Sequence, residues 1–491
     1  MELILALDAG TTGVRTVAFG DHLETVAESY RELPQHFPSP GEVEHDPRQI
    51  VDLAVATLRE VAQRVRADGH EVAALGLTNQ RETTVGFDRE SGEVFHNALV
   101  WQDRRTASMC QALEAAGHGP AVRAATGLVL DPYFSATKMR WILDRGLADC
   151  ARTPSFATID TWLLWALSGG VEGGVYRTEA SNASRTSLLD LATRAWSPAM
   201  LSLFGVERSM LAEVAPSAGV FGHLAADVVP ELAGVAITGV LGDQQAALFG
   251  QACFTPGLVK ATYGTGAFVL ASAGENVPPV VNGLLTTVAW DLGSFGAVNY
   301  ALEGSAFVAG AAVQWLRDLG LINQSSDLEG LAKTVGDSAG AIFVPAFTGL
   351  GSPFWRPDAR GALMGLSRGV TSAHVARAVV EALAFQVRAM TDAFQDGGVG
   401  VHELRADGGA AAMDLLLSLQ ATNSRVTVRR STTLESTARG AASIAGLAAG
   451  RWDSLEELSD LWRAGATFVP EDPSVVDPGY AAWTRAIERT R

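Results

Sequence analysis

A hairpin whose turn is rich in glycine and threonine is predicted twice in this chain, once at the start of each half. The first begins with an apolar run, Leu3 to Leu7, which is typical of a buried strand, and it returns after a turn of Gly10 to Gly13. The second spans Leu258 to Ala271 and repeats the order of strand, Gly-Thr-Gly turn and strand. The repetition indicates two domains of related topology that face a shared cleft.

The length of the chain agrees with two domains. At 491 residues it exceeds the roughly 250–300 residues at which a single hydrophobic core stops growing. The second hairpin begins soon after residue 251, so we place the boundary there. We therefore expect an N-terminal domain of residues 1–251 and a C-terminal domain of residues 252–491.

The tip of the first hairpin carries groups that suit a polyphosphate. Its first strand ends in Asp8, and Arg15 follows the turn. The turn itself offers backbone N–H groups and the hydroxyls of Thr11 and Thr12. Amides and hydroxyls can meet phosphate oxygens, while a carboxylate orients hydrated magnesium. The alternative is an ordinary hairpin turn, since glycine and threonine are common in turns.

Charged and aromatic residues also follow predicted strands of the first half. Arg81 and Glu82 come after the strand Val72 to Leu77, and the cluster Trp101 to Arg105 follows another short apolar run. In open α/β sheets, ligands bind outside the carboxyl ends of strands. The alternative is a surface salt-bridge cluster beside a packing tryptophan. Tyr133, in a loop before a helix, is either a pocket wall with a hydroxyl or a core aromatic.

An acidic residue stands near the middle of the chain at the end of a third strand. The apolar run Val235 to Leu241 gives way through Gly242 to Asp243 and Gln244 at the start of a helix of small residues. A carboxylate at this place can act as a general base, as a metal ligand or simply as a helix cap.

The second half offers two features of a nucleotide site. The Gly408-Gly409 turn lies between a strand and a helix, where a nucleotide can approach the backbone and the helix N-terminus supplies donors. Gly310 and Gln314 lie one turn apart on one face of a predicted helix.

Six further segments have patterns that predict an element. We expect a helix from Pro47, capped by Asp46, to Gly69; a hairpin from Val85 to Phe95; a loop-rich insertion from Thr178 to Trp196; a strand ending at Tyr300 to Gly304; a helix from Ala373 to Phe394, capped by Thr371; and a final helix from Thr437 to Gly450.

Composition excludes several classes of function. The formal charge of −17 argues against nucleic-acid or anionic-membrane binding as the main activity. Cys110, Cys150 and Cys253 show no paired spacing, so we expect neither a disulfide framework nor a zinc site. The N-terminus lacks a secretory pattern and no apolar run is long enough to span a bilayer. We expect a soluble cytoplasmic protein.

Together these stretches resemble the glycerol kinases, members of the FGGY carbohydrate kinases, which share the actin and heat-shock-chaperone ATPase fold. The resemblance covers nearly the whole chain. It rests on Asp8 to Arg15, Thr78 to Thr84, Val100 to Arg105, Thr126 to Tyr133, Ser181 to Thr186, Gly242 to Gly250, Thr262 to Gly266, Tyr300 to Gly304, Pro345 to Pro353 and Asp407 to Ala410, with the family signature around Lys138 and Trp141. It implies an α/β fold of two actin-like (ribonuclease H-like) domains facing a central catalytic cleft.

The resemblance also implies an activity, the ATP-dependent phosphorylation of glycerol to sn-glycerol 3-phosphate in glycerol catabolism. Five residues match those that hydrogen-bond the hydroxyls of glycerol: Arg81, Glu82, Tyr133, Asp243 and Gln244. Trp101 and Phe268 match the apolar walls against its carbon backbone. Asp243 matches the general base that takes the proton of the attacked hydroxyl.

ATP and Mg²⁺ are the other ligands that the resemblance implies. The phosphate hairpin corresponds to Thr11, Thr12, Gly13 and the catalytic Arg15, and the nucleotide side corresponds to Thr265, Gly310, Gln314, Gly409 and Met413. Asp8 and Asp243 match the carboxylates near magnesium. Because water could replace the alcohol as acceptor, we expect the two domains to close over the cleft.

The chain departs from the glycerol kinases at several positions. Ala9 and Gly13 stand where glycerol kinases usually have Gln and Ser, which makes the hairpin resemble that of the pentulose kinases. Met413 replaces an Asn that usually hydrogen-bonds adenine. The glycine-rich loop for fructose-bisphosphate inhibition is absent near His223, and Ala192 replaces the His phosphorylated by phosphotransferase. We expect a homodimer or homotetramer without these two controls. A kinase of another small polyol or keto-sugar (dihydroxyacetone, erythritol or xylulose) is the alternative; a non-kinase ATPase or sensor is a distant one.

Overall fold

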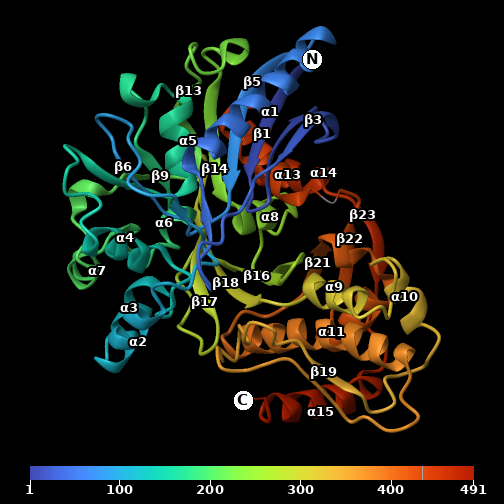
Figure 1. The fold of residues 1–491 in the computed structure, drawn as a ribbon. Coiled ribbons are helices and arrows are strands. Elements are labelled where there is room, and N and C mark those ends of the chain that lie inside the picture. Colours follow the sequence, from blue (N-terminus) through green and yellow to red (C-terminus); the bar gives the residue numbers. More distant parts are fainter. Residues whose placement is uncertain (434, 491) are drawn as a thin grey trace.

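The computed structural model describes residues 1–433 and 435–490, and two mixed sheets dominate it (Figure 1). The first sheet has the order β13-β14-β5-β1-β2-β3. Strand β1 pairs antiparallel with β2 and parallel with β5, which in turn pairs parallel with β14. The strands are β1 (Glu2–Ala9), β2 (Gly13–Phe19), β3 (Thr25–Glu32), β5 (Glu71–Asn79), β13 (Ala218–His223) and β14 (Ala236–Gly242).

The second sheet, of order β17-β18-β16-β15-β21-β22-β23, follows the same plan. Its hairpin, β15–β16, is antiparallel, and β15 pairs parallel with β21, which pairs parallel with β22. The prediction of two related hairpins is therefore confirmed. The strands are β15 (Leu258–Tyr263), β16 (Ala267–Gly274), β17 (Leu285–Asp291), β18 (Val298–Ala306), β21 (Glu403–Asp407), β22 (Thr427–Ser431) and β23 (Ala464–Phe468).

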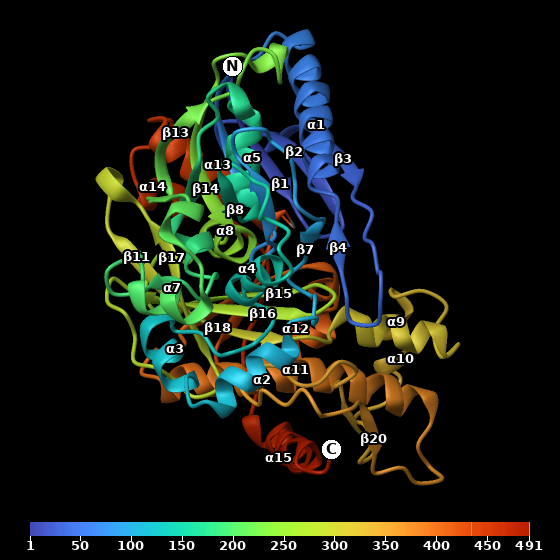
Figure 2. The same cartoon turned by 60° about the vertical axis from the view of Figure 1, so that its left-hand side comes forward.

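Helices cover both faces of the first sheet, because β1 buries alternate side chains on opposite sides. Leu3, Leu5 and Leu7 pack with α1 and α5, while Ile4 and Ala6 pack with α8 and α13. Figure 2 shows α1 and α13 on either side of β1. The Asp46 carboxylate accepts a hydrogen bond from the N–H of Arg48 and caps α1, as predicted. These helices are α1 (Pro47–Ala67), α5 (Ile159–Leu167), α8 (Asp243–Gly250) and α13 (Ser436–Ala448).

Helix α13 comes from the end of the chain yet packs on the first sheet, as its red colour among blue and green strands shows (Figure 1). Its small residues allow close approach: a Cβ on Gly440 would clash with the carbonyl oxygen of Ala246 in α8. The final helix is therefore confirmed, and it joins the second half of the chain to the first sheet. The domain boundary near residue 251 stays a prediction.

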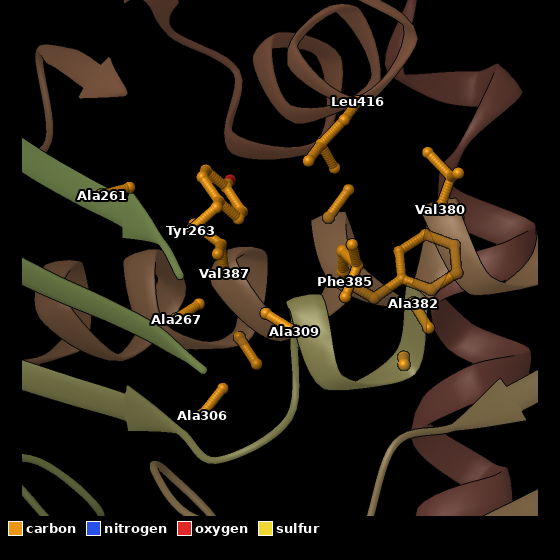
Figure 3. Packing of buried hydrophobic residues seen from close by; sticks show 14 of the residues in the cluster. Ala261, Tyr263, Ala267, Ala306, Ala309, Val380, Ala382, Phe385, Val387 and Leu416 are labelled. Atoms are coloured by element: carbon orange, nitrogen blue, oxygen red, sulfur yellow. The ribbon is translucent and has the colours of Figure 1, made fainter. Parts of the chain in front are cut away.

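The second sheet packs against the long helix α11. Val387 of α11 lies beside Tyr263 of β15, while Val380, Ala382 and Phe385 lie farther along the same core, which also contains Leu416 of α12 (Figure 3). Thr371 caps α11 as predicted. The helices of this half are α9 (Gly310–Asp318), α10 (Asp327–Ala332), α11 (Ser372–Asp396), α12 (Asp414–Ser424), α14 (Leu455–Leu461) and α15 (Asp477–Ile487).

The remaining elements lie mostly between β3 and β13. They are β4 (Glu44–His45), β6 (Val85–Asp88), β7 (Ala98–Leu99), α2 (Ala107–Ala115), α3 (Gly119–Thr126), α4 (Ser135–Asp144), β8 (Pro154–Ala157), β9 (Arg177–Glu179), α6 (Ala180–Ala183), β10 (Leu189–Asp190), β11 (Ala195–Trp196), α7 (Pro198–Phe204) and β12 (Glu213–Ala215), with β19 (Ile342–Val344) and β20 (Ala362–Met364) in the second half. Among the described residues, no helix combines the length and the apolar character needed to cross a bilayer.

Two local predictions differ from the structure. The turn after β6 forms, with Phe87 bridging Val94, but the ladder partner of β6 is β8. Tyr300 to Gly304 lies inside β18 rather than at its end. The predicted loop-rich insertion from Thr178 to Trp196 does consist of short elements joined by turns, although its residues 178–189 are all buried. Its buried polar side chains have partners both inside and outside the segment, such as Glu179 for Ser181 and Glu82 for Arg185, so the polarity of the sequence does not reveal the burial.

Candidate active site

The tip of the β1–β2 hairpin brings the predicted phosphate residues together. Asp8 lies opposite Arg15 in the ladder, and the N–H of Gly10 donates to the carbonyl oxygen of Gly13 at 2.9 Å. Thr11 is half-buried and its hydroxyl accepts a hydrogen bond from Nε1 of Trp101 at 2.9 Å. Thr12 is exposed. The hairpin is thus tied directly to one predicted wall of the glycerol pocket.

Gly13 is explained by its neighbour on β3. A Cβ at this position would clash with the ring of Tyr30, whose hydroxyl donates to the carbonyl oxygen of Thr12 at 3.2 Å. The guanidinium of Arg15 lies 5.3 Å from the centroid of the same ring. Tyr30 therefore occupies the space that a larger residue at position 13 would need.

Asp8 and Arg15 sit among charges from both halves of the chain. Arg15 forms an ion pair with Glu435, which directly precedes α13. Burial raises the pKa of Asp8 to about 7, and the negative charges of Asp243 and Glu435 add to the shift while Arg15 opposes it. The carboxylate of Asp8 thus lies in a region with an excess of negative charge.

Arg81 and Glu82 leave the end of β5 through a strained turn. Glu82 has φ of +60°, and the N–H of Thr83 donates to the carbonyl oxygen of Arg81 at 2.7 Å. A non-glycine residue in this region costs energy and is typical of functional sites. The hydroxyl of Ser135 donates to the carbonyl oxygen of Glu82 at 3.0 Å and helps to hold the turn.

The buried guanidinium of Arg81 joins several of the predicted glycerol residues. Its Nε lies 3.1 Å from Oδ1 of Asp243, and its Nη2 lies 3.4 Å from the hydroxyl of Tyr133. It also donates two hydrogen bonds to Glu303, at 2.6 and 3.0 Å. Although burial alone would lower it, the pKa of Arg81 is raised by the charges of Glu303 and Glu82.

Glu303 and Arg185 belong to this network but had no predicted role. Nε of Arg185 donates to Glu82 at 2.7 Å, and its Nη2 donates to Glu303 at 3.1 Å. Burial would raise the pKa of Glu303, but the charges of Arg185 and Arg81 lower it to about 2. Both residues lie in segments that carried the family resemblance, Ser181 to Thr186 and Tyr300 to Gly304. Their place in these segments was the only signal in the sequence that could have indicated a role at this site.

Gln244 contacts a third residue that sequence reasoning missed, Lys260 of β15. The ammonium of this buried lysine donates to Oε1 of Gln244 at 2.5 Å. The N–H of Gln244 donates to Oδ1 of Asp243 at 2.7 Å. Asp243 and Gln244 are half-buried at the start of α8.

Three aromatic rings form the apolar side of the pocket. The Trp101 ring lies 5.5 Å from Tyr133 and 6.2 Å from Phe268, in edge-to-face arrangements. Such pairs are a favoured geometry for aromatic side chains. The structure therefore brings together all seven residues predicted to bind glycerol.

The predicted nucleotide residues lie near the end of β15. The carbonyl oxygen of Thr265 accepts hydrogen bonds from the N–H groups of Ala309 and Ala311, at 2.8 and 3.1 Å. Gly310 lies so close to Gly264 that a Cβ would stand 2.7 Å from its carbonyl oxygen. Gln314 is exposed on α9 beside Arg317.

Gly409 begins a short 3-10 helix, Gly409–Ala412, and Met413 follows it. Gly408, with φ of +86°, lies against the backbone of Tyr263, and no atom stands within 4 Å of a Cβ placed on Gly409. Met413 is buried in the core of the second sheet. The Gly-Gly turn therefore leaves open space beside the backbone, as a bound nucleotide would need.

The two residues predicted to lie near magnesium are Asp8 and Asp243. Within residues 1–433 and 435–490, no group of three His, Cys, Asp or Glu side chains could hold a metal ion. The two carboxylates lie near each other, since the negative charge of Asp243 contributes to the raised pKa of Asp8. Magnesium in phosphotransfer sites is typically bound by one or two carboxylates, waters and substrate phosphates, so a pair of carboxylates suffices.

A cavity of about 500 Å³ lies at the other end of the first sheet, where β5 begins. It contains none of the predicted site residues; its lining includes Arg66, His70 and Glu231.

Comparison with known proteins identifies this arrangement. Residues 3–250 match the N-terminal domain, and residues 259–449 the C-terminal domain, of the FGGY family of carbohydrate kinases. The glycerol kinase of Acidovorax ebreus is 47% identical over 99% of this chain and 99% of its own length. That of Stenotrophomonas maltophilia strain K279a is 48% identical over 99% of this chain and 98% of its own.

Solved structures agree with these relatives. A crystal structure of Plasmodium falciparum glycerol kinase with ADP has a TM-score of 0.92 and 34% identity, covering 100% of this chain and 98% of that one. A gluconate kinase from Lactobacillus acidophilus has a TM-score of 0.90 at 21% identity, covering 99% of this chain and 98% of that one, and shows the shared fold alone. The expected pair of actin-like domains is thereby confirmed. This chain belongs to the FGGY family of carbohydrate kinases and, within it, to the glycerol kinases.

Proposed function

We propose that this protein transfers the γ-phosphoryl group of ATP to glycerol, which yields sn-glycerol 3-phosphate and ADP. The observation that carries the proposal is the convergence of Arg81, Asp243 and Tyr133 beside an aromatic wall. A small neutral triol needs a few fixed donors and acceptors next to an apolar surface, and this pocket supplies both.

The polar groups divide between donors and acceptors. Arg81 is a donor only, while Glu82 and Asp243 accept hydrogen bonds from hydroxyl groups. Tyr133 and Gln244 can do either. Trp101 and Phe268 supply the apolar surface for the carbon chain of glycerol. Because Arg81 and Glu82 are buried and hydrogen-bonded, the pocket is formed before the substrate arrives.

Asp243 is the general base in this proposal. Its carboxylate takes the proton from the attacked hydroxyl as the oxygen bonds to the γ-phosphorus, and the bond from that phosphorus to the bridging oxygen of ADP breaks. Arg81, 3.1 Å away, and the N–H of Gln244, 2.7 Å away, hold the carboxylate in place. Phosphoryl transfer asks little more of a protein than alignment, charge stabilisation and a base.

The hairpin tip is the proposed phosphate site. Thr11, Thr12, the backbone of Gly13 and Arg15 would meet phosphate oxygens. The excess negative charge around Asp8 fits a divalent cation, so we assign Mg²⁺ to Asp8 and Asp243. Bound Mg²⁺ would neutralise charge on the phosphates. On the nucleotide side we assign Thr265, Gly310, Gln314, Gly409 and Met413.

The test is coupled ADP release with glycerol, dihydroxyacetone, erythritol, xylulose and no acceptor. We expect glycerol to give the highest kcat/KM. A glycerol rate equal to the rate without acceptor would overturn the proposal, and a preference for xylulose would favour a keto-sugar kinase. Tyr133→Phe is a matched variant, since it removes one pocket hydroxyl and keeps the aromatic ring; it should raise the KM for glycerol more than that for ATP.

Two further proposals concern the whole protein. Because the reaction consumes ATP, we place it in the cytoplasm, which localisation of a tagged chain would test. We also propose a homodimer or homotetramer, which sedimentation analysis of the purified protein would test.

A further inference from the structure

Lys260 is a buried cation that the proposed chemistry does not use. It lies in the middle of β15, the strand that leads to the turn with Thr265, and its side chain is fully buried. Its ammonium has two partners: Oε1 of Gln244 at 2.5 Å and the carbonyl oxygen of Phe268 at 3.4 Å. Both partners belong to residues assigned to the glycerol pocket.

Burying this ammonium carries a cost. Burial lowers the pKa of Lys260 to about 8, although the charges of Asp407 and Asp243 oppose the shift. A methionine would fill similar space without that cost, since an apolar side chain loses nothing when water is removed. A buried charge kept beside a binding pocket therefore points to a function rather than to stability.

The contact with Lys260 determines which way the amide of Gln244 faces. A lysine ammonium has three donors and no acceptor, so the atom next to it must be the carbonyl oxygen Oε1. The NH₂ group then points to the opposite side of the amide plane. Without such a donor, the two ends of a glutamine amide have similar shape and either orientation is accessible.

We propose that Lys260 is a positioning residue for the phosphoryl acceptor: it fixes the amide of Gln244 so that only its N–H groups face a hydroxyl of glycerol. The inference rests on the proposed function and deepens it. Gln244 then acts as a donor beside Asp243, which accepts. With Gln244 as donor and Asp243 as acceptor, the site distinguishes the glycerol hydroxyl that receives a hydrogen bond from the glycerol hydroxyl that gives up its proton. Lys260 acts through Gln244 and does not itself touch the substrate.

The test compares Lys260→Met, which removes all three donors at similar volume, with Lys260→Arg, which keeps donors. For Lys260→Met we expect the KM for glycerol to rise about tenfold, while the KM for ATP and the melting temperature change little. Lys260→Arg should restore part of the affinity. Gln244→Glu gives an independent reading, because it still accepts from Lys260 but has no N–H for glycerol; its KM for glycerol should rise as well.

A double mutant separates positioning from general damage. If Lys260 acts through Gln244, adding Lys260→Met to Gln244→Ala should cause no further rise in the KM for glycerol. The inference would be overturned by an unchanged KM for glycerol in Lys260→Met or in Gln244→Glu. It would also be overturned by additive effects in the double mutant, or by equal rises in the KM values for glycerol and ATP. The wild-type rate with glycerol, measured first, reports on the proposed function separately: its absence would overturn both proposals, and its presence leaves the Lys260 comparison decisive.

Discussion

Arg81 and Glu303 join the two sheets at the candidate active site. Arg81 follows β5 of the first sheet, Glu303 lies in β18 of the second, and two hydrogen bonds of 2.6 and 3.0 Å connect them. Both side chains are buried. The same arginine contacts Asp243 at 3.1 Å, so the second half of the chain helps to place the proposed base of the first.

Glu303→Gln should therefore weaken both the fold and the pocket. It removes the charge that two arginines share, and breaking a buried ion pair typically costs about 3–5 kcal/mol. We expect a lower denaturation midpoint and a higher KM for glycerol. Glu231→Gln is the control, because Glu231 pairs with Arg59 at 3.1 Å outside the site and is only partly buried, beside an arginine that is about half exposed. Equal behaviour of the two variants in both measurements would contradict the assigned role of Glu303.

Asp243→Asn should abolish turnover without abolishing nucleotide binding. The amide keeps the shape of the side chain but cannot take a proton, and loss of a general base costs about 10²–10⁴ in rate. Stopped-flow ADP release and calorimetric titration with ATP measure the two properties. Asp291→Asn is the control, since Asp291 contacts Arg194 at the same 3.1 Å outside the site. Full activity of Asp243→Asn would remove it as the base.

The pH dependence of ATP use should report on Asp8. Its pKa is raised to about 7, mainly by burial, so the folded protein holds a proton there at pH 6 that the unfolded chain has released. Magnesium binding requires the ionised carboxylate. We expect kcat/KM for MgATP to fall by about tenfold per pH unit below 7, as one protonation predicts. An invariant kcat/KM between pH 6 and 8 would contradict this.

The raised pKa of Asp8 also affects stability, but there a rise in pH is unfavourable, whereas it favours activity. Between pH 4 and 7 the folded state binds more protons than the unfolded state, so the free energy of unfolding falls as pH rises through this window. Asp8→Asn removes this contribution. We expect the variant to be inactive yet more stable than the wild type at pH 8, by about 1–3 kcal/mol in urea titrations. At pH 4 the two proteins should have similar stability, and a loss of stability at pH 8 would contradict the prediction.

The sequence predicted those parts of the site that local patterns encode. Strand β1, the turn after it and the capped helices α1 and α11 depend on periodicity, caps and glycine, which act over a few residues. The roles of Arg185, Lys260 and Glu303 do not depend on such local patterns. Each is a charged residue in a buried segment, where pattern reading expects apolar side chains. Only the partners contributed by distant segments explain their burial, and a single sequence does not show those partners.

The docking of α13 on the first sheet was also beyond the sequence, and it can be tested. A methyl group at Gly440 would clash with the backbone of α8, which has no side chain to move aside. Overpacking of this kind typically costs about 1–3 kcal/mol, so Gly440→Ala should lower the melting temperature. Gly330→Ala is the control: this exposed glycine of α10 has no atom within 4 Å of a Cβ, and it should gain stability from helix propensity. Equal effects of the two variants would contradict the close approach of α13.

The hydrogen bond from Trp101 to Thr11 links the aromatic wall of the glycerol pocket to the phosphate hairpin. Its removal should change the KM values for ATP and glycerol by different amounts. Trp101→Phe keeps an aromatic wall beside Tyr133 and Phe268 but loses the 2.9 Å bond to the hairpin. A hydrogen bond of this kind is worth about 0.5–1.5 kcal/mol, so we expect the KM for ATP to rise by about twofold to tenfold. The KM for glycerol should change less, because the apolar contact remains.

The matched control for that variant is Trp196→Phe. Nε1 of Trp196 donates to the carbonyl oxygen of Ala212 at 2.8 Å, and the ring packs in a separate core cluster. This variant should lower the melting temperature and leave both KM values unchanged, because the bond that it loses holds no ligand group. A rise of the KM for glycerol alone in Trp101→Phe would mean that the indole serves only as a wall. A selective rise of the KM for ATP would mean that the pocket for the alcohol also sets the position of the phosphates, which is what in-line transfer between the two requires.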